Sequence, residues 1–167
     1  MPAKKNKGKN NDGYGAELLS GLKTNGQGVF EISEREDGFI AASNWPPRYF
    51  SGYADWTRRE LQAIRLVKGR VLDIGCGAGR FLLHLQQKGF KATGIDNSNG
   101  AVKVCKLRGV QDARHMSIDE IGRFKPASFD TVIMMGNNFG LFGGFKKAKR
   151  LLKKPLCDYL SRRPDYC

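Results

Sequence analysis

The sequence predicts an α/β protein, a three-layer sandwich in which helices cover both faces of a mostly parallel, doubly wound sheet. Strand and helix patterns alternate from Val71 onward, an order typical of parallel strands joined by helical crossovers. The apolar run VLDI leads directly into the glycine-rich turn GCGAG, which places a ligand-binding turn at the carboxyl end of a strand. Gly89 and Gly109 each follow an amphipathic pattern and mark the ends of two helices.

The chain before this alternation predicts a tail and a small β-structure. Residues 1–15 are rich in Lys, Asn and Gly and predict a basic, disordered tail. Residues 16–48 form a second segment, in which 28–43 predict two strands with EREDG as their turn. One helix is expected over 48–67. Its apolar or aromatic residues at helical spacing are Trp56, Leu61, Ile64 and Val67.

The main predicted domain covers 49–154, and an irregular tail follows over 155–167. Four parallel strands are expected, at Val71–Ile74, Lys91–Ile95, Val110–His115 and Thr131–Met135. Helices are expected at 79–89, 99–109 and 145–154. The last helix is basic and amphipathic, and Pro155 stops it.

Charge and cysteine content narrow the class of protein. The 167-residue chain has a formal net charge of +13, most of it at the two ends. Basic ends can hold nucleic acid phosphates, but a solubilising tail and a solvated helix face explain them as well, because no aromatic residue is interleaved with KKNKGK. The sequence shows no transmembrane stretch and no secretory signal. The four cysteines form no CxxC pair, which argues against a metal site and predicts a cytoplasmic protein.

The glycine-rich turn indicates which ligand the sheet binds. Its GxGxG spacing differs from the dinucleotide fingerprint GxGxxG, and Arg80 stands where the third fingerprint glycine belongs. Asp73 lies two residues before the turn, where a carboxylate opposes a pyrophosphate but suits a cationic ligand. S-adenosylmethionine has no phosphate and carries a positive sulfonium and a positive amine. The turn therefore favours S-adenosylmethionine over NAD.

Asp96 supplies a second anchor. It ends the next strand, where an acidic side chain can accept hydrogen bonds from both ribose hydroxyls. Its alternative role is the N-cap of the following helix, because Asp before NSNGAV is an ordinary helix start. The glycine turn at this spacing favours the ribose role.

Residues from about 49 to 154 resemble a class I S-adenosylmethionine-dependent methyltransferase. The resemblance rests on VLDIGCGAGR, TGIDNS, the SIDEI segment and FDTVIMMGNNFG. It implies a Rossmann-like fold with the family strand order 3-2-1-4-5-7-6. By position, the resemblance implies that Asp73, Gly75, Cys76 and Gly77 bind the methionine end of the cofactor. Asp96 and Asn97 would bind the ribose and the neighbouring adenine edge, and Ser117 and Ile118 would lie beside the adenine. Gly136 and Asn137 would lie near the sulfonium and the methyl acceptor.

One position and one group of aromatic residues leave alternatives open. Ser117 stands where the family often has an acidic residue, which puts a side-chain contact to the adenine amine in doubt. Four aromatic residues precede the first motif, where such enzymes often carry a lid, although helical spacing also explains them as core. They are Tyr49, Phe50, Tyr53 and Trp56.

The reaction implied is a displacement in which a nucleophile of the acceptor takes the methyl group and a neutral thioether leaves, with the protein mainly aligning the partners. No catalytic base is identifiable. A small-molecule acceptor is favoured, and RNA stays open because of the charge. Two other classes remain: a non-catalytic module that binds the cofactor, and a dinucleotide-dependent oxidoreductase, which Arg80 and Asp73 oppose.

The end of the chain carries a further expectation. The family fold has seven strands, but no candidate follows TVIMM, and LCDYLSRRPDYC has neither alternation nor a β-branched run. Either a partner supplies the missing strands or, as the unlike tail favours, the chain is truncated after its fourth strand, with that strand as an exposed edge. Such a chain would self-associate or be marginally stable, bind the cofactor weakly and transfer little methyl.

Overall fold

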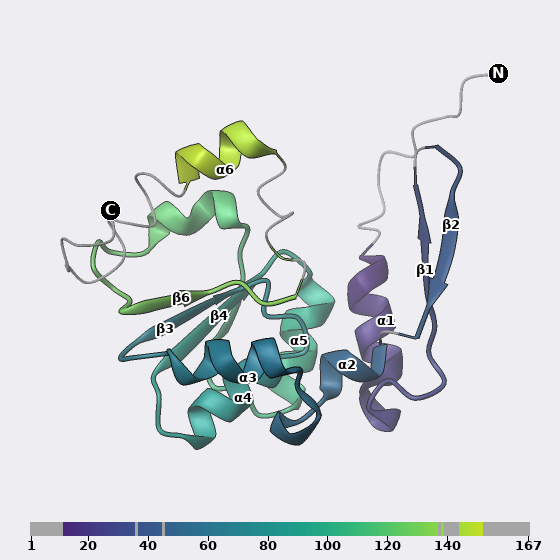
Figure 1. Ribbon diagram of the computed structural model, residues 1–167, viewed down its shortest axis with the longest axis horizontal. Helices are drawn as coiled ribbons and strands as arrows, with labels where there is room; N and C mark the ends of the chain where they lie inside the picture. The colour runs from purple at the N-terminus through teal and green to yellow at the C-terminus, as the bar shows by residue number, and fades with distance from the viewer. Residues whose placement is uncertain (1–11, 36, 45, 137, 139–143, 152–167) are drawn as a thin grey trace.

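The computed structural model describes residues 12–35, 37–44, 46–136, 138 and 144–151. Its centre is a parallel sheet in the order β5-β4-β3-β6, which confirms the predicted α/β class (Figure 1). The strands are β3 (Val71–Ile74), β4 (Ala92–Asp96), β5 (Ala113–His115) and β6 (Thr131–Ile133). β5 begins later than predicted because the Val110 amide donates to the Cys105 carbonyl and closes the preceding helix instead of pairing in the sheet.

Helices cover both faces of the sheet. On one face lie α3 (Arg58–Arg65), α4 (Arg80–Gln87) and α5 (Asn99–Leu107), and on the other lie the 3-10 turn η3 (Ile118–Arg123) and α6 (Phe145–Leu151). Successive strand residues point to opposite faces, and both Val71 and Leu72 have 0% exposure. Strands buried on both sides explain the continuous apolar runs of the sequence.

β6 pairs with β3 on one side within the part of the chain that the structure describes. Ile133 packs in the cluster of Trp56 and Val71, whereas Val132 packs on the opposite cluster, which includes Ala148 of α6. The faces of this strand are therefore covered. Residues 152–167 lie outside the described residues, so the truncation and the self-association that it implies stay predictions.

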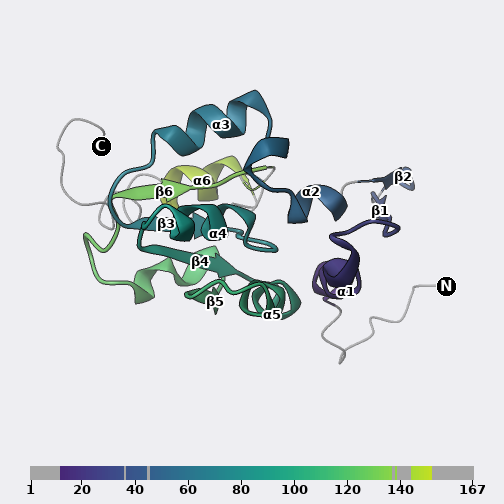
Figure 2. The ribbon, with the colours of Figure 1, turned by 90° about the horizontal axis from the view of Figure 1, so that it is seen from below.

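The N-terminal part adds a cap beside the sheet (Figure 2). It contains α1 (Gly13–Gly21), the short turn η1 (Leu22–Thr24), the hairpin β1 (Glu31–Glu34) and β2 (Ile40–Ser43), and α2 (Pro46–Phe50). We call these elements the N-terminal cap. The predicted hairpin is confirmed, with Glu31 opposite Ser43 in an antiparallel register.

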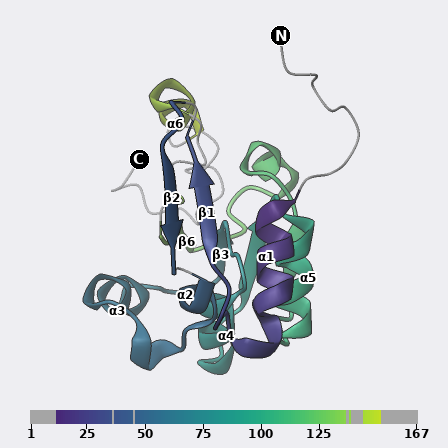
Figure 3. The same ribbon diagram turned by 90° about the vertical axis from the view of Figure 1, so that its right-hand side faces the viewer.

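Helix α1 corrects the predicted disordered tail, which extended to residue 15. Asp12 caps this helix by accepting a hydrogen bond from the Gly15 amide. The sequence GYGAELLSG conceals the helix because three glycines lower its helix propensity. Tertiary contacts with α5 stabilise it instead, as Figure 3 shows by the two helices lying side by side. Residues 1–11 of the predicted tail lie outside the described residues.

The single helix predicted over 48–67 is wrong. The structure has α2, the 3-10 turn η2 (Tyr53–Asp55) and α3 in its place. Gly52 and Trp56 are extended, which breaks the helical path. Thr57 then starts α3 through a capping box with Glu60. The turn thus buries Trp56 at the helix start rather than along a continuous helical face.

The described residues lack a membrane-spanning helix and a metal-binding cluster. None of their helices combines the length and apolarity needed to cross a bilayer. The same residues contain no group of three or more His, Cys, Asp or Glu side chains able to hold a metal ion.

Candidate functional site

The glycine turn sits between β3 and α4 at the carboxyl end of the sheet. Gly75, Gly77 and Gly79 all have positive φ, with values of 74°, 54° and 76°. The amides of Gly75 and Cys76 donate to the Ile95 carbonyl of β4 at 2.8 and 3.1 Å. The turn is therefore fixed against the end of the neighbouring strand. Because Gly77 has no side chain, a ligand can approach its backbone closely.

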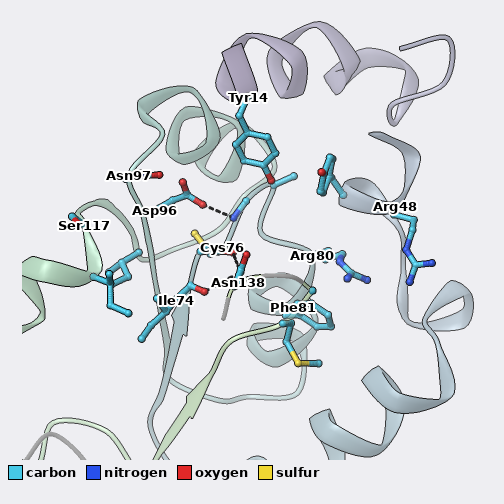
Figure 4. A pocket seen from close by; sticks show the side chains of 18 of the residues that line it. Tyr14, Arg48, Ile74, Cys76, Arg80, Phe81, Asp96, Asn97, Ser117 and Asn138 are labelled. Atoms are coloured by element: carbon cyan, nitrogen blue, oxygen red, sulfur yellow. Dashed lines mark hydrogen bonds between the residues drawn. The ribbon is translucent and has the colours of Figure 1, made fainter. Parts of the chain in front are cut away.

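A cavity of about 750 Å³ opens above this turn (Figure 4). Its floor comes from the strand ends and its roof from the N-terminal cap. Eight of the ten predicted site residues line it: Gly75, Cys76, Gly77, Asp96, Asn97, Ser117, Ile118 and Gly136. Asp73 does not line it, and Asn137 lies outside the described residues. A volume in this range is typical of small-molecule and cofactor sites.

Asp96 lies in the cavity wall, and its carboxylate is held by the backbone. Its Oδ2 accepts from the Gly77 amide and its Oδ1 accepts from the Ser98 amide, both at 2.9 Å. Burial raises the pKa of this carboxyl above its usual value, although those hydrogen bonds oppose the shift. The N-cap of α5 is Ser98, not Asp96. The helix-cap alternative for Asp96 is therefore wrong.

Asp73 is placed differently from the prediction. It is 1% exposed and does not line the cavity, and its Oδ2 has no hydrogen-bond partner among the described residues. Burial, with a smaller contribution from the charge of Asp96, raises the pKa of Asp73 to about 7, against the opposing effect of Arg80. The predicted cofactor-binding role of Asp73 stays a prediction, and its charge and protonation state are the properties by which it can act on the cavity from behind the turn.

The strand β5 and turn η3 form one end of the cavity, where Ser117, Ile118 and Asp119 line it. The Ser117 hydroxyl accepts from the Asp119 amide at 3.2 Å as the cap of η3. The doubtful side-chain role of Ser117 thus has a structural cause, because its hydroxyl serves the turn. The sequence analysis missed Asp119, whose signal is an acidic residue two positions after the expected one.

The opposite end of the cavity is basic. Arg48 and Arg80 line it, and both guanidinium groups pair with Glu60, which starts α3. Burial raises the pKa of Glu60, but hydrogen bonds from Arg80 and Thr57 outweigh it and hold the pKa below its usual value. Two cations and one anion leave a net positive charge at this wall. The capping motif TRRE is visible in the sequence, but its ion pair with Arg80 depends on the fold.

Hydroxyl and carboxyl groups of the cap form the roof. The Glu31 Oε2 atom accepts from Tyr49 Oη and from Ser43 Oγ, both at 3.3 Å. Tyr14 meets Tyr49 edge to face, with ring centroids 5.3 Å apart. These residues line the cavity together with Ser33, and the sequence analysis singled out Tyr49 alone among them.

The four aromatic residues of the expected lid divide between the two alternatives. Tyr49 lines the cavity, whereas Phe50 and Trp56 are buried in hydrophobic clusters. Tyr53 stacks on His84 with centroids 4.6 Å apart. The core interpretation is confirmed for Phe50 and Trp56, whereas the lid interpretation stays a prediction for Tyr49.

The segment after β6 closes the floor. Asn138 donates from Nδ2 to the carbonyls of Ile74 and Gly75 at 3.0 and 2.7 Å. Gly136 lines the cavity with a φ of 76°. This contact links the segment after the fourth strand to the glycine turn.

Comparison with known sequences decides the family. Residues 71–155, which make up just over half of the chain, match the sequence model of a family described as "Methyltransferase domain". The chain belongs to this methyltransferase family.

Curated relatives of the methyltransferase include two proteins named ubiquinone biosynthesis O-methyltransferase. The one from Paracidovorax citrulli is 38% identical over 72 residues, which are 40% of this chain and 30% of that protein. The one from Xanthomonas oryzae pv. oryzae is 35% identical over 125 residues, which are 65% of this chain and 50% of that protein. The matched region thus spans half of these relatives or less.

A solved structure resembles most of the methyltransferase chain. It is a SAM-dependent methyltransferase from Bacteroides fragilis in complex with S-adenosyl-L-homocysteine, with a TM-score of 0.76 and 26% identity. The similarity covers 91% of this chain and 61% of that one. Together with the family match, it supports the Rossmann-like fold and S-adenosylmethionine as the cofactor.

The cavity residues fit this cofactor chemically. A buried carboxylate at Asp96 provides free lone pairs, and guanidinium groups lie at the far end. The unpartnered oxygen of Asp73 adds a second buried carboxyl behind the glycine turn, which suits a cationic ligand better than a pyrophosphate.

Proposed function

We propose that this chain binds S-adenosylmethionine in the cavity and transfers its methyl group to a hydroxyl group of a small-molecule acceptor. One observation carries the proposal: a single cavity joins the glycine turn and Asp96 to a wall of cap residues that carry hydroxyl, carboxyl and guanidinium groups. A cofactor and a second, polar molecule therefore have adjacent places.

The cofactor half is assigned from the chemistry of each wall. Asp96 accepts hydrogen bonds from the ribose hydroxyls, since each of its oxygens is bound by one backbone amide and retains a lone pair. Asn97, Ile118 and Asp119 border the adenine, and Ser117 contributes its backbone. The methionine end lies along Gly75, Cys76 and Gly77. Its carboxylate faces the net positive wall at Arg48 and Arg80.

Bound S-adenosylmethionine supplies an electrophilic methyl group. The chain's own residues bind and orient the two molecules, which accounts for most of the rate gain in a reaction of this kind. Gly136 and Asn138 border the space between the glycine turn and the cap. We place the methyl acceptor there, under Tyr14 and Tyr49.

The roof favours an acceptor that carries a hydroxyl group. Glu31, Ser33 and Ser43 offer hydrogen-bond acceptors to such a group, and Glu31 is already held by Tyr49. The curated relatives carry the name O-methyltransferase, which supports the same class of acceptor. An RNA acceptor stays an open alternative, and the basic end residues 1–11 and 152–167 on which it depends lie outside the described part of the chain.

A cytoplasmic location belongs to the proposal. Cys76 and Cys105 are buried free thiols with their sulfur atoms 3.9 Å apart. Two thiols this close that remain unlinked are consistent with a reducing compartment.

Titration calorimetry tests the cofactor half. S-adenosylmethionine and S-adenosylhomocysteine should bind and NADH should not. Binding of NADH alone would favour the oxidoreductase.

A panel of phenols and matching anilines then tests the acceptor, with tritiated methyl transfer as the readout. Binding without transfer to any acceptor would favour a non-catalytic module.

A further inference from the structure

Helix α1 touches the body of the molecule through bare backbone. A Cβ atom built on Gly15 would lie 2.7 Å from the Cα atom of Gly100, and one built on Gly100 would lie 2.5 Å from that of Gly15. Neither position tolerates a side chain without separation of the helices. The first turns of α1 and α5 are therefore in direct contact, as Figure 3 shows by their parallel course.

One carboxylate caps both helices at this contact. The Oδ1 atom of Asp12 accepts from the Gly15 amide of α1 at 2.8 Å. Its Oδ2 atom accepts from the Gly100 amide and the Ser98 hydroxyl of α5, at 2.8 and 2.9 Å. Burial raises the pKa of Asp12, but these three hydrogen bonds outweigh it and lower the pKa below its usual value. The charged form is thus the one that holds the two helix starts together.

The capped turn of α1 carries a residue of the cavity. Tyr14 is the second residue of α1, and its hydroxyl lies so close to Gly77 that a Cβ atom there would be 2.6 Å from it (Figure 4). On the other helix, the Ser98 amide binds Asp96 while its hydroxyl binds Asp12. The same few residues therefore fix Tyr14 over the glycine turn and hold the carboxylate assigned to the ribose.

We infer that Asp12 is a positioning residue for cofactor binding. By capping α1 and α5 together, it holds Tyr14 over the glycine turn and closes the cofactor cavity from the N-terminal side. Asp12 does not line the cavity, and it lies outside the family match over 71–155. This inference rests on the proposed function, because it states how that same site is completed.

The test compares Asp12→Ala with wild type in the full chain, with S-adenosylhomocysteine as the probe. Calorimetry should give binding about tenfold weaker, and hydrogen exchange of the amides of residues 13–21 should become faster while β3 and β4 are unaffected. Asp12→Asn keeps one acceptor oxygen and should recover part of the affinity. Asp55→Ala removes an exposed carboxylate that does not line the cavity and should bind within about twofold of wild type.

A second variant covers failure of Asp12→Ala to fold. Gly15→Ala keeps Asp12 in the chain, but its Cβ atom would strike both the Asp12 carboxylate and the Gly100 backbone. It should therefore displace the carboxylate from its capping position, separate α1 from α5 and weaken binding in the same way. Faster exchange in α1 with unchanged affinity would overturn the positioning role, as would unchanged exchange and affinity together. Failure of wild type to bind S-adenosylhomocysteine would instead overturn the proposed function and this inference with it.

Discussion

The glycine turn and the N-terminal cap face each other across one cavity, but they are specified in different ways. The turn is a continuous stretch, 75–79, whose conformation follows from its own glycines and the strand before it. The cap assembles Tyr14, Glu31, Ser43, Arg48 and Tyr49 from separate elements. Its residues have no motif spacing, because they meet only after the hairpin and α1 have docked.

Under the proposed function, this difference separates the residues that bind the cofactor from the residues that bind the acceptor. The turn supplies backbone, and Asp96 at the end of β4 supplies a carboxylate bound to it; under the proposed function both serve any acceptor equally. The cap supplies side chains with hydroxyl and charged groups, which can select an acceptor. Variants in the turn should therefore abolish cofactor binding. Variants in the cap should change the affinity for the cofactor only modestly.

Gly77→Val should have the largest effect. Gly77 has a φ of +54°, which a β-branched residue rarely adopts, and its Cβ would strike the Tyr14 hydroxyl. We expect S-adenosylhomocysteine affinity to fall by at least about 1000-fold, or about 4 kcal/mol, in calorimetry. Gly52→Val is the matched control, since Gly52 has a φ of −86° and open space around it. Normal binding by Gly77→Val would place the cofactor elsewhere.

Asp73 should make the stability of the chain depend on pH. Its folded pKa of about 7 exceeds the unfolded value of 3.8, so the folded state holds the proton more tightly. The contribution of Asp73 to the free energy of unfolding is therefore largest below about pH 4. It falls by on the order of 3–4 kcal/mol as the pH rises to about 7. Urea unfolding of wild type and Asp73→Asn from pH 4 to 8 measures this slope.

The isosteric Asp73→Asn variant should show a smaller fall in stability between pH 4 and 7, and Asp96 and Glu17, whose pKa values burial also raises, contribute the remainder. Asp12 and Glu60 have pKa values that are lowered in the fold, so their contributions disappear only at lower pH. An equal slope in both proteins would show that Asp73 is not the group responsible.

Asp96→Ala should weaken cofactor binding by at least about tenfold, or about 1.4 kcal/mol, because the ribose hydroxyls lose a charged acceptor. The fold should persist, since Ser98 and not Asp96 caps α5. Calorimetry with S-adenosylhomocysteine and a circular dichroism spectrum measure the two effects. Unchanged affinity in a folded variant would limit Asp96 to supporting the Gly77 and Ser98 amides.

Tyr49→Phe should have the smallest effect. It removes one hydrogen bond of 3.3 Å to Glu31 and keeps the ring that packs on Tyr14. Such a hydrogen bond contributes about 0.5–1.5 kcal/mol to the free energy of unfolding, so we expect the variant to lose an amount of this size. Affinity for S-adenosylhomocysteine should change by less than about threefold. A tenfold loss of affinity would indicate that Tyr49 contributes to cofactor binding. The glycine turn and the cap would then no longer differ in their importance for the cofactor.

The sequence by itself determined the sheet, the helices that directly follow its strands, and the glycine turn. Each of these depends on local patterns, namely apolar runs, helix-ending glycines and the spacing of GCGAG. Asp96 and Asn97 could be placed in the site because the carboxyl ends of neighbouring parallel strands meet at one edge.

The tertiary structure alone decided the remaining features. Asp73 and Cys76 are three residues apart, but the sheet buries the first behind the turn and leaves the second in the cavity. Helix α1 has three glycines and becomes a helix because Gly15 packs against Gly100 and Asp12 caps both partners. These outcomes depend on residues more than 80 positions apart in the sequence. A local pattern cannot encode such contacts, since their energy exists only once the distant backbone is in place.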